Sequence, residues 1–217
     1  MQIFLVRHGE TDGNVAHRHQ VERTPLTTKG KEQAREVAER LESLKPTRLL
    51  TSKLVRAIET ARIIGEVCNL TPETSENFVE LKRPNHLYGR YHKSAHSLWF
   101  YFWWFLGLKR ADKNGESYAE LRQRFLKAKA ELAGFAPEDK VVVVSHAAFM
   151  ALFTAHLCRN KKLSLFQATK TFYRIITMPN TAVIEIEYEH KSSYSQTDGK
   201  GASKKSSCLW RVNKYYW

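Results

Sequence analysis

Residues 2–11 read Gln2-Ile3-Phe4-Leu5-Val6-Arg7-His8-Gly9-Glu10-Thr11, and this stretch combines a structural pattern with a chemical one. Residues 2–7 form an apolar run with β-branched and aromatic members, which predicts a buried β-strand. A basic side chain, an imidazole and a glycine stand where that run ends. The stretch therefore predicts a strand that leads directly into a polar site.

Strands and helices are expected to alternate along the rest of the chain. Helices are predicted after a cap at Thr27 or Thr28 up to Pro46, over 54–65, from Ser117 through Leu132 and over 147–157; strands are predicted over 48–51, 71–76, 141–144 and 181–188. Residues 208–217 are a candidate last strand, paired with 181–188. This alternation predicts an α/β fold, a three-layer sandwich whose mostly parallel central sheet is flanked by helices.

The chain has 217 residues, a length that fits a single domain over 1–217. An insertion is expected at about 81–114, and a flexible loop rich in Ser, Lys and Gly at about 190–207. The insertion contains Arg83, His86, Arg90 and His92, whose contact with substrate is left open. The insertion contains an aromatic-rich run at 98–106 that is too short to span a bilayer. We expect this helical run to cover the site as a lid or to lie in a homodimer interface. Shallow insertion into a membrane surface is the less favoured alternative.

The formal net charge of +13 favours anionic partners. No nucleic-acid-binding module is recognisable, so we expect no specific nucleic-acid partner and interpret the basic C-terminal residues as a solvated surface. Residues 2–6 already read as a strand, so no signal peptide is expected. Cys68, Cys158 and Cys208 are odd in number and far apart, which predicts reduced thiols in a cytoplasmic protein.

Three basic side chains are placed near strand ends. His8 follows the first strand, His146 follows the strand at 141–144, and Arg56 lies near the start of the helix after the second strand. Ligands of parallel sheets bind beyond the carboxyl ends of the strands, so we expect these groups to converge. His17 and His19 have the spacing of a metal-binding pair, but a surface loop is favoured because no further convergent ligands are evident. We expect neither a metal ion nor another cofactor.

These residue types suit the chemistry of a phosphate monoester, which carries nearly two negative charges. Arg7 and Arg56 can each hold two phosphate oxygens, and the neutral imidazole of His8 can attack phosphorus to form a phosphohistidine. Glu80, after the third strand, is the candidate proton donor to the leaving group. Glu116 is the rival candidate, although it is expected to cap its helix or to pair with an arginine of the pocket.

The stretch 5–11 resembles the signature of the histidine phosphatase superfamily, which includes the cofactor-dependent phosphoglycerate mutases. The resemblance extends in order over about residues 1–188, through Asn14, Pro25-Leu26-Thr27, Gly30, Gln33-Ala34, Ser52, Arg56-Ala57, Thr60-Ala61, Gly115-Glu116-Ser117 and Val144-Ser145-His146-Ala147. It implies that His8 is the nucleophile, that Arg7, Asn14, Arg56 and His146 form the phosphate pocket, and that Glu80 is the acid. The chain departs from the pattern at Gln20-Val21, where many relatives have Gln-Gly, and in the residues that follow Glu80.

The predicted function is therefore that of a metal-independent phosphatase that acts on small-molecule or other phosphate esters through a phosphohistidine, with His8, Glu80 and His146 as its catalytic residues. A phosphoglycerate mutase-type phosphotransferase and a non-catalytic phospholigand-binding module are the alternatives. A basic protein of membranes or nucleic acids, for which hydrolysis is secondary, is a further one. The sequence leaves the substrate open among sugar phosphates, nucleotides, phosphoproteins and lipid-like phosphates.

Overall fold

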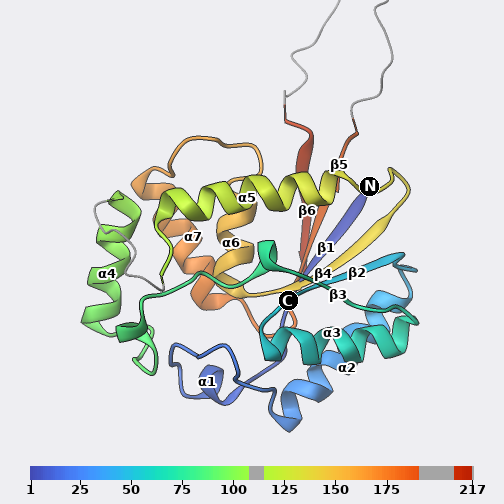
Figure 1. Cartoon of the computed structure of the whole chain (residues 1–217), viewed down its shortest axis with the longest axis horizontal. Helices are drawn as coiled ribbons and strands as arrows, with labels where there is room; N and C mark the ends of the chain where they lie inside the picture. Colours follow the sequence, from blue (N-terminus) through green and yellow to red (C-terminus); the bar gives the residue numbers. More distant parts are fainter. Residues whose placement is uncertain (108–114, 191–207, 217) are drawn as a thin grey trace, which may run out of the picture.

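The computed structural model describes residues 1–107, 115–190 and 208–216 (Figure 1). Most of the predicted flexible loop at 190–207 lies outside these residues. Within them, a six-stranded sheet has the order β3-β2-β4-β1-β5-β6. Its strands are β1 (Gln2–Arg7), β2 (Arg48–Ser52), β3 (Glu73–Ser75), β4 (Lys140–Ser145), β5 (Val183–Tyr188) and β6 (Trp210–Tyr216). The first four strands are parallel, and β5 and β6 are antiparallel to their neighbours.

Helices cover both faces of the sheet, which confirms the predicted three-layer sandwich. Helices α2 (Thr28–Glu42) and α3 (Val55–Cys68) cover one face, and α5 (Tyr118–Ala133) and α6 (Ala147–Ala155) cover the other, with α7 (Leu165–Thr177) beside α6 (Figure 1). The described residues also include α1 (Asp12–Val15), α4 (Ala95–Leu106) and two short 3₁₀ turns, η1 (Glu76–Phe78) and η2 (Asn85–Leu87).

Strand β1 is apolar throughout because both of its faces are buried. Ile3 and Leu5 point into the core under α5 and α6, whereas Phe4 and Val6 point into the core under α2 and α3. Successive side chains of a strand alternate between faces, so a central strand needs a continuous apolar run. This explains why the first apolar run of the sequence lies in the middle of the sheet.

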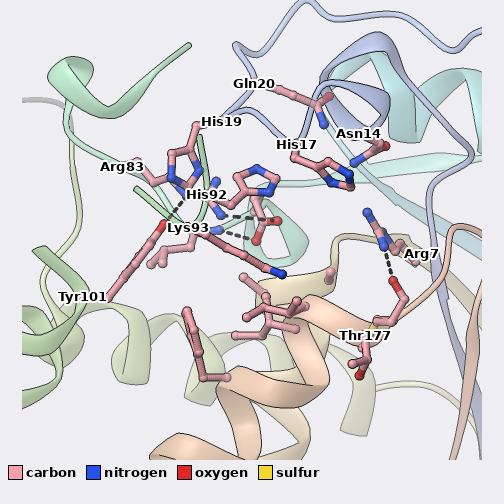
Figure 2. A pocket seen from close by; sticks show the side chains of 18 of the residues that line it. Arg7, Asn14, His17, His19, Gln20, Arg83, His92, Lys93, Tyr101 and Thr177 are labelled. Carbon is pink, nitrogen blue, oxygen red and sulfur yellow. Dashed lines mark hydrogen bonds and ion pairs between the residues drawn. The ribbon is translucent and has the colours of Figure 1, made fainter. Parts of the chain in front are cut away.

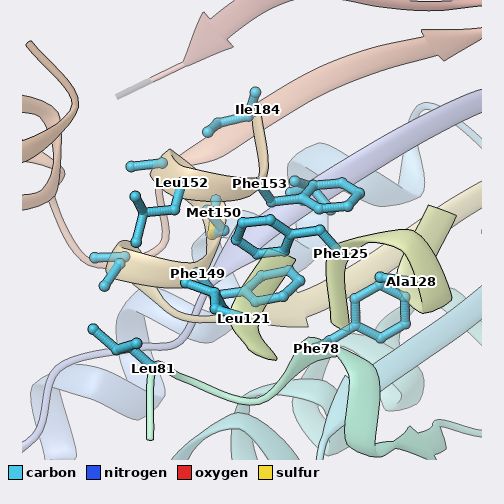
Figure 3. Close-up of a cluster of buried hydrophobic side chains, with 14 of the residues drawn as sticks. Phe78, Leu81, Leu121, Phe125, Ala128, Phe149, Met150, Leu152, Phe153 and Ile184 are labelled. Atoms are coloured by element: carbon cyan, nitrogen blue, oxygen red, sulfur yellow. The ribbon is translucent and has the colours of Figure 1, made fainter. Parts of the chain in front are cut away.

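Aromatic rings fill the core between the sheet and helices α5 and α6 (Figure 3). Phe149 and Phe153 stack with ring centroids 5.3 Å apart, and Phe125 contacts both rings from α5. Phe149 is fully buried three residues after His146, near the start of α6. This packing holds the start of α6 against the end of β4.

Two glycines allow α2 to approach the loop after β1. A Cβ atom on Gly9 would lie 2.2 Å from the carbonyl oxygen of Gly30, and a Cβ on Gly30 would lie 2.1 Å from the carbonyl oxygen of Glu10. These contacts are backbone to backbone, so no side chain could move aside. Thr27 is the cap of α2, since its hydroxyl accepts the N–H of Gly30 at 3.0 Å.

The prediction of reduced thiols is wrong for two of the three cysteines. Cys158 and Cys208 form a disulfide with Cα atoms 5.3 Å apart, and Cys68 is free. Strand β6 pairs with β5, as predicted. This pairing brings Cys208 beside the segment that follows α6, so that Cys208 can form a disulfide with Cys158. A sequence separation of 50 residues does not reveal such proximity. The cytoplasmic location, which was argued from reduced thiols, stays a prediction.

The region predicted as an insertion contains α4, which matches the aromatic run. Phe100 and Trp104 are buried, whereas Trp99 and Phe102 are more than half exposed. Among the described residues, no helix is long and apolar enough to cross a membrane.

Candidate active site

The ends of β1 and β4 bring two histidines together, as predicted from strand order. The backbone N–H of His8 donates to the carbonyl of Ser145 at 3.0 Å. The rings of His8 and His146 lie close together, with their centroids 5.1 Å apart, and both side chains are buried.

The His8 ring has one defined tautomer. Its Nδ1 atom lies 2.7 Å from the carbonyl oxygen of Gly9. A carbonyl can only accept, so Nδ1 carries the proton and Nε2 keeps a lone pair. Burial, and then the positive charges of Arg56 and Arg7, lower the pKa of His8 well below its ordinary value of 6.5. The imidazole is therefore neutral at physiological pH and can act as a nucleophile through Nε2.

His146 is a neutral donor. Its Nε2 lies 2.8 Å from the hydroxyl of Ser52, and that hydroxyl also accepts the N–H of Leu54 at 3.2 Å. The hydroxyl proton of Ser52 is thus free to point at Nε2, which places the ring proton on Nδ1. Burial, and then Arg56, lower the pKa of His146 well below 6.5. Among the described residues, Nδ1 is buried without a hydrogen-bond partner.

Arg7 and Arg56 supply positive charge to the same place. Burial lowers the pKa of each to about 10, so both remain cations at neutral pH. One Nη atom of Arg7 donates to the carbonyl of Met178, and one of Arg56 donates to that of Val21 at 3.0 Å. The Nε atoms of both arginines are buried and have no partner within the described part of the chain. Buried donors without acceptors are costly, and an anion would satisfy them.

Arg7, His8, Asn14, Arg56 and Glu80 line one cavity of about 990 Å³, part of which Figure 2 shows. The structure thus brings five of the six predicted site residues to one cavity, and His146 lies directly behind His8. The side-chain oxygen of Asn14 accepts from the N–H of Thr11 at 3.2 Å. The amide NH₂ of Asn14 is consequently the group that can contact an anion.

Glu80 and Glu116 occupy different environments. Glu80 lines the cavity, and its Oε1 accepts the backbone N–H groups of Leu81 at 2.8 Å and Phe149 at 3.1 Å. Glu116 instead accepts the N–H of Lys82 at 2.9 Å and pairs with Arg124 at 2.5 Å.

Arg124 also donates to the carbonyl of Val79 at 2.6 Å. The Glu116–Arg124 pair therefore holds the segment that carries Glu80, outside the cavity. Glu116 thus pairs with an arginine, but not with one of the pocket as expected, because Arg124 does not line the cavity. The cap of the helix is Ser117.

The cavity wall includes Arg83 and His92, whose contact with substrate the sequence left open, and His19, which was not expected there. Arg83 lies 3.8 Å from Glu80 and donates from Nε to the Tyr101 hydroxyl at 2.7 Å. His19, expected on a surface loop, is 5% exposed and lies against His92, with ring centroids 4.6 Å apart. Burial and Arg83 lower the pKa of His19 to about 2 and that of His92 to about 4. The basic residues that follow Glu80 in the sequence were the available signal.

Over 1–107, 115–190 and 208–216, no group of three or more His, Cys, Asp or Glu side chains is arranged to hold a metal ion. His17 lines the cavity but is exposed, unlike His19.

Two sequence relatives illustrate what the chain is similar to. It is 31% identical over 172 residues to the adenosylcobalamin/alpha-ribazole phosphatase of Salmonella typhi. The aligned residues cover 76% of this chain and 84% of that protein. It is 49% identical over 69 residues to a probable phosphoglycerate mutase of Enterobacter sp. (strain 638). That second match covers 31% of this chain and spans only 32% of the mutase.

Among solved structures, the native mycobacterial glucosyl-3-phosphoglycerate phosphatase superposes with a TM-score of 0.71 and 26% identity, over 98% of this chain and 96% of that one. The profile of the histidine phosphatase superfamily (branch 1) matches residues 3–197. The chain therefore belongs to branch 1 of the histidine phosphatase superfamily, as the signature at residues 5–11 predicted.

Proposed function

We propose that the protein is a phosphatase that hydrolyses phosphate monoesters through a phosphohistidine at His8, without a metal ion. The observation that carries this proposal is the set of buried, unpartnered donors around a neutral imidazole: Arg7 Nε, Arg56 Nε and His146 Nδ1. Two cations and a neutral donor suit the charge of a phosphoryl group. The similarity to an alpha-ribazole phosphatase over most of both chains supports a hydrolase.

The first step transfers the phosphoryl group. The lone pair on His8 Nε2 forms a bond to phosphorus while the bond from phosphorus to the ester oxygen breaks. Glu80, protonated for this step, gives its proton to the leaving oxygen, so that an alcohol departs. Arg7 and Arg56 hold the phosphoryl oxygens during the transfer, and His146 donates to one of them.

The second step releases phosphate. Glu80, now a carboxylate, takes a proton from a water molecule whose oxygen attacks phosphorus. The bond from phosphorus to Nε2 breaks, and its electron pair returns to the imidazole as inorganic phosphate leaves. Val15 and Tyr91 line the cavity and are more than half exposed, which supports access of water to the phosphoenzyme.

The partial match to phosphoglycerate mutases favours a second candidate, a mutase that returns the phosphoryl group to a sugar-acid hydroxyl. Both candidates share the first step, so the fate of the phosphoenzyme separates them. A non-catalytic module would form no phosphoenzyme at all.

The test is hydrolysis of an aryl phosphate by the purified protein in excess chelator. We expect phosphate release that survives chelation and disappears in His8→Ala, together with an acid-labile phosphoenzyme in the wild type only. His156→Gln is the matched control, because His156 is also a buried histidine but does not line the cavity. Loss of activity on chelation would overturn the metal-free mechanism. Phosphoenzyme that forms but is discharged only by an acceptor alcohol would favour the mutase.

A further inference from the structure

The cavity is much larger than a phosphate group requires. Its volume of about 990 Å³ lies at the upper end of the range of about 300–1,000 Å³ that holds drug-sized ligands. The phosphate-binding residues occupy one end, at the tips of β1 and β4. The remaining volume must accommodate the alcohol part of the ester.

Three helices form an apolar wall along this remaining volume. We define the apolar wall as Tyr101, Trp104 and Phe105 of α4, Leu152 of α6, and Phe172 and Ile175 of α7. The rings of Tyr101 and Phe172 approach to 6.3 Å between centroids, which joins α4 to α7. Ile176 also lines the cavity and is 43% exposed, so apolar surface continues to the outside of α7.

This wall has almost no capacity to bind polar groups. None of the described lining residues from α4, α6 and α7 is charged. The Tyr101 hydroxyl already accepts from Arg83 Nε at 2.7 Å, and the Thr177 hydroxyl donates to the carbonyl of Tyr173 at 2.9 Å. A sugar placed against the wall would bury hydroxyls without partners, which is costly.

We infer that the preferred substrates are phosphate monoesters of large apolar alcohols, whose hydrocarbon part lies on the apolar wall. This inference rests on the proposed phosphatase function and adds its substrate class. Burial of hydrocarbon on such a wall is favourable in proportion to the area removed from water. The opposite wall, with His17, His92 and Lys93, can accept a polar group at one side of the same ligand (Figure 2).

The first experiment compares phosphate esters of primary alcohols that differ in apolar size or in polarity. These are ethyl phosphate, octyl phosphate below its critical micelle concentration, and glycerol phosphate. We expect kcat/KM to rise by about tenfold or more from ethyl to octyl phosphate, and to be lowest for glycerol phosphate. Equal values for the three esters, or a preference for glycerol phosphate, would overturn the inference while leaving the phosphatase proposal intact.

The second experiment tests the wall itself. Phe172→Ala is expected to lower kcat/KM for octyl phosphate by about tenfold, mainly through KM, and to leave that for ethyl phosphate unchanged. Phe172→Leu should retain most of the wild-type kcat/KM for octyl phosphate. Phe166→Ala is the matched control, because Phe166 lies on the same helix, is 78% exposed and does not line the cavity. An equal loss for both esters in Phe172→Ala would contradict a specificity role.

Binding to His8→Ala separates this inference from the proposed chemistry. By calorimetry, octyl phosphate should bind this variant at least about tenfold more tightly than ethyl phosphate, and Phe172→Ala should remove the difference. If no ester were hydrolysed but this difference were found, the phosphatase proposal would fail and the apolar subsite would stand. If the two esters bound equally, the subsite would fail whatever the activity.

Discussion

The imidazole rings of His8 and His146 lie 5.1 Å apart between centroids, and their planes are tilted by 56°. Both rings are buried beside Arg7 and Arg56, and both pKa values lie well below 6.5. The pair is therefore uncharged, with a lone pair on one ring and a donor on the other. The positive charge next to the pair is therefore that of Arg7 and Arg56, which a phosphate ester needs.

The first prediction concerns the protonation of these rings. Because their pKa values are lowered, the neutral forms persist as pH falls through 6.5, whereas histidines of an unfolded chain become protonated near that pH. We expect the NMR signals of His8 and His146, assigned with His8→Ala and His146→Ala, to remain those of neutral rings between pH 7.5 and about pH 5.5. The urea-unfolded protein is the control. Titration of either ring near pH 6.5 in the folded protein would contradict the prediction.

The second prediction separates the two candidate acids. Glu80→Gln removes the proton donor, so kcat for an alkyl phosphate should fall by about 10²–10⁴. The loss should be smaller for an aryl phosphate, whose leaving group needs less protonation. Steady-state kinetics on both esters measure this difference. A uniform loss would indicate a positioning role for Glu80.

Glu116→Gln should affect stability instead. It breaks the buried pair with Arg124 and leaves that arginine uncompensated, which costs about 3–5 kcal/mol of unfolding free energy. Urea unfolding measures the loss, and kcat of the folded fraction should fall far less than in Glu80→Gln, because Arg124 still donates to the carbonyl of Val79. A large fall in kcat without loss of stability would make Glu116 the acid.

The third prediction concerns phosphate binding by Arg56. Arg56→Lys keeps the charge but loses the planar fork and the Nε donor, so affinity for inorganic phosphate should fall by roughly tenfold or more. Isothermal titration measures this. Arg62→Lys is the control, because Arg62 is an exposed residue of the same helix. Unchanged affinity in Arg56→Lys would exclude bidentate recognition.

The fourth prediction concerns the disulfide. Cys158 and Cys208 close a chain segment with a sequence separation of 50, and such closure stabilises a fold by about 2–4 kcal/mol. We expect Cys158→Ser with Cys208→Ser to lower the melting temperature without changing kcat/KM, since neither cysteine lines the cavity. Cys68→Ser is the control. An equal melting temperature would mean that β6 is held by its pairing with β5 alone.

The fifth prediction concerns stability in mild acid. Burial lowers the pKa of His19 to about 2 and those of His92 and His156 to about 4. In the unfolded chain these histidines bind protons near pH 6.5, whereas in the folded chain they stay neutral at that pH. The free energy of unfolding should therefore fall as pH drops from 7 to 5. Each such proton contributes up to about 1.4 kcal/mol per pH unit.

Urea unfolding at several pH values measures this slope. His156→Gln should reduce it, because the variant lacks one of the protons taken up on unfolding. A free energy of unfolding that is constant over this range would contradict the lowered pKa values.

The sheet and the phosphate-binding end of the cavity could be predicted because short stretches of sequence encode them. The apolar runs at β1 and β4 require burial on both faces, and the side chains that follow parallel strands meet at one edge. The position of Glu80 in the cavity also followed from the strand before it. The catalytic roles of these residues, the homodimer and any membrane contact stay predictions.

The rest of the cavity wall depends on packing between segments distant in sequence. Helix α7 was not predicted, although Phe172 and Ile175 line the cavity and complete the apolar wall. Arg83 and His19 come from separate loops that meet only in the folded chain. The disulfide likewise depends on where β6 lies. Local patterns indicate at most that basic residues follow Glu80; they do not show which distant segments these residues meet.

The close approach of Gly9 and Gly30 has a consequence for how the protein tolerates mutation. In a saturation screen for activity, both positions should reject every other residue, alanine included, because a Cβ at either would push the His8 loop away from α2. Position 89 should also favour glycine, but for a different reason. The φ of Gly89 is +76°, a conformation that residues with a Cβ rarely adopt, although the space around it is open. Active variants of the protein are thus expected to keep glycine at positions 9 and 30, although no atom of either residue takes part in the reaction.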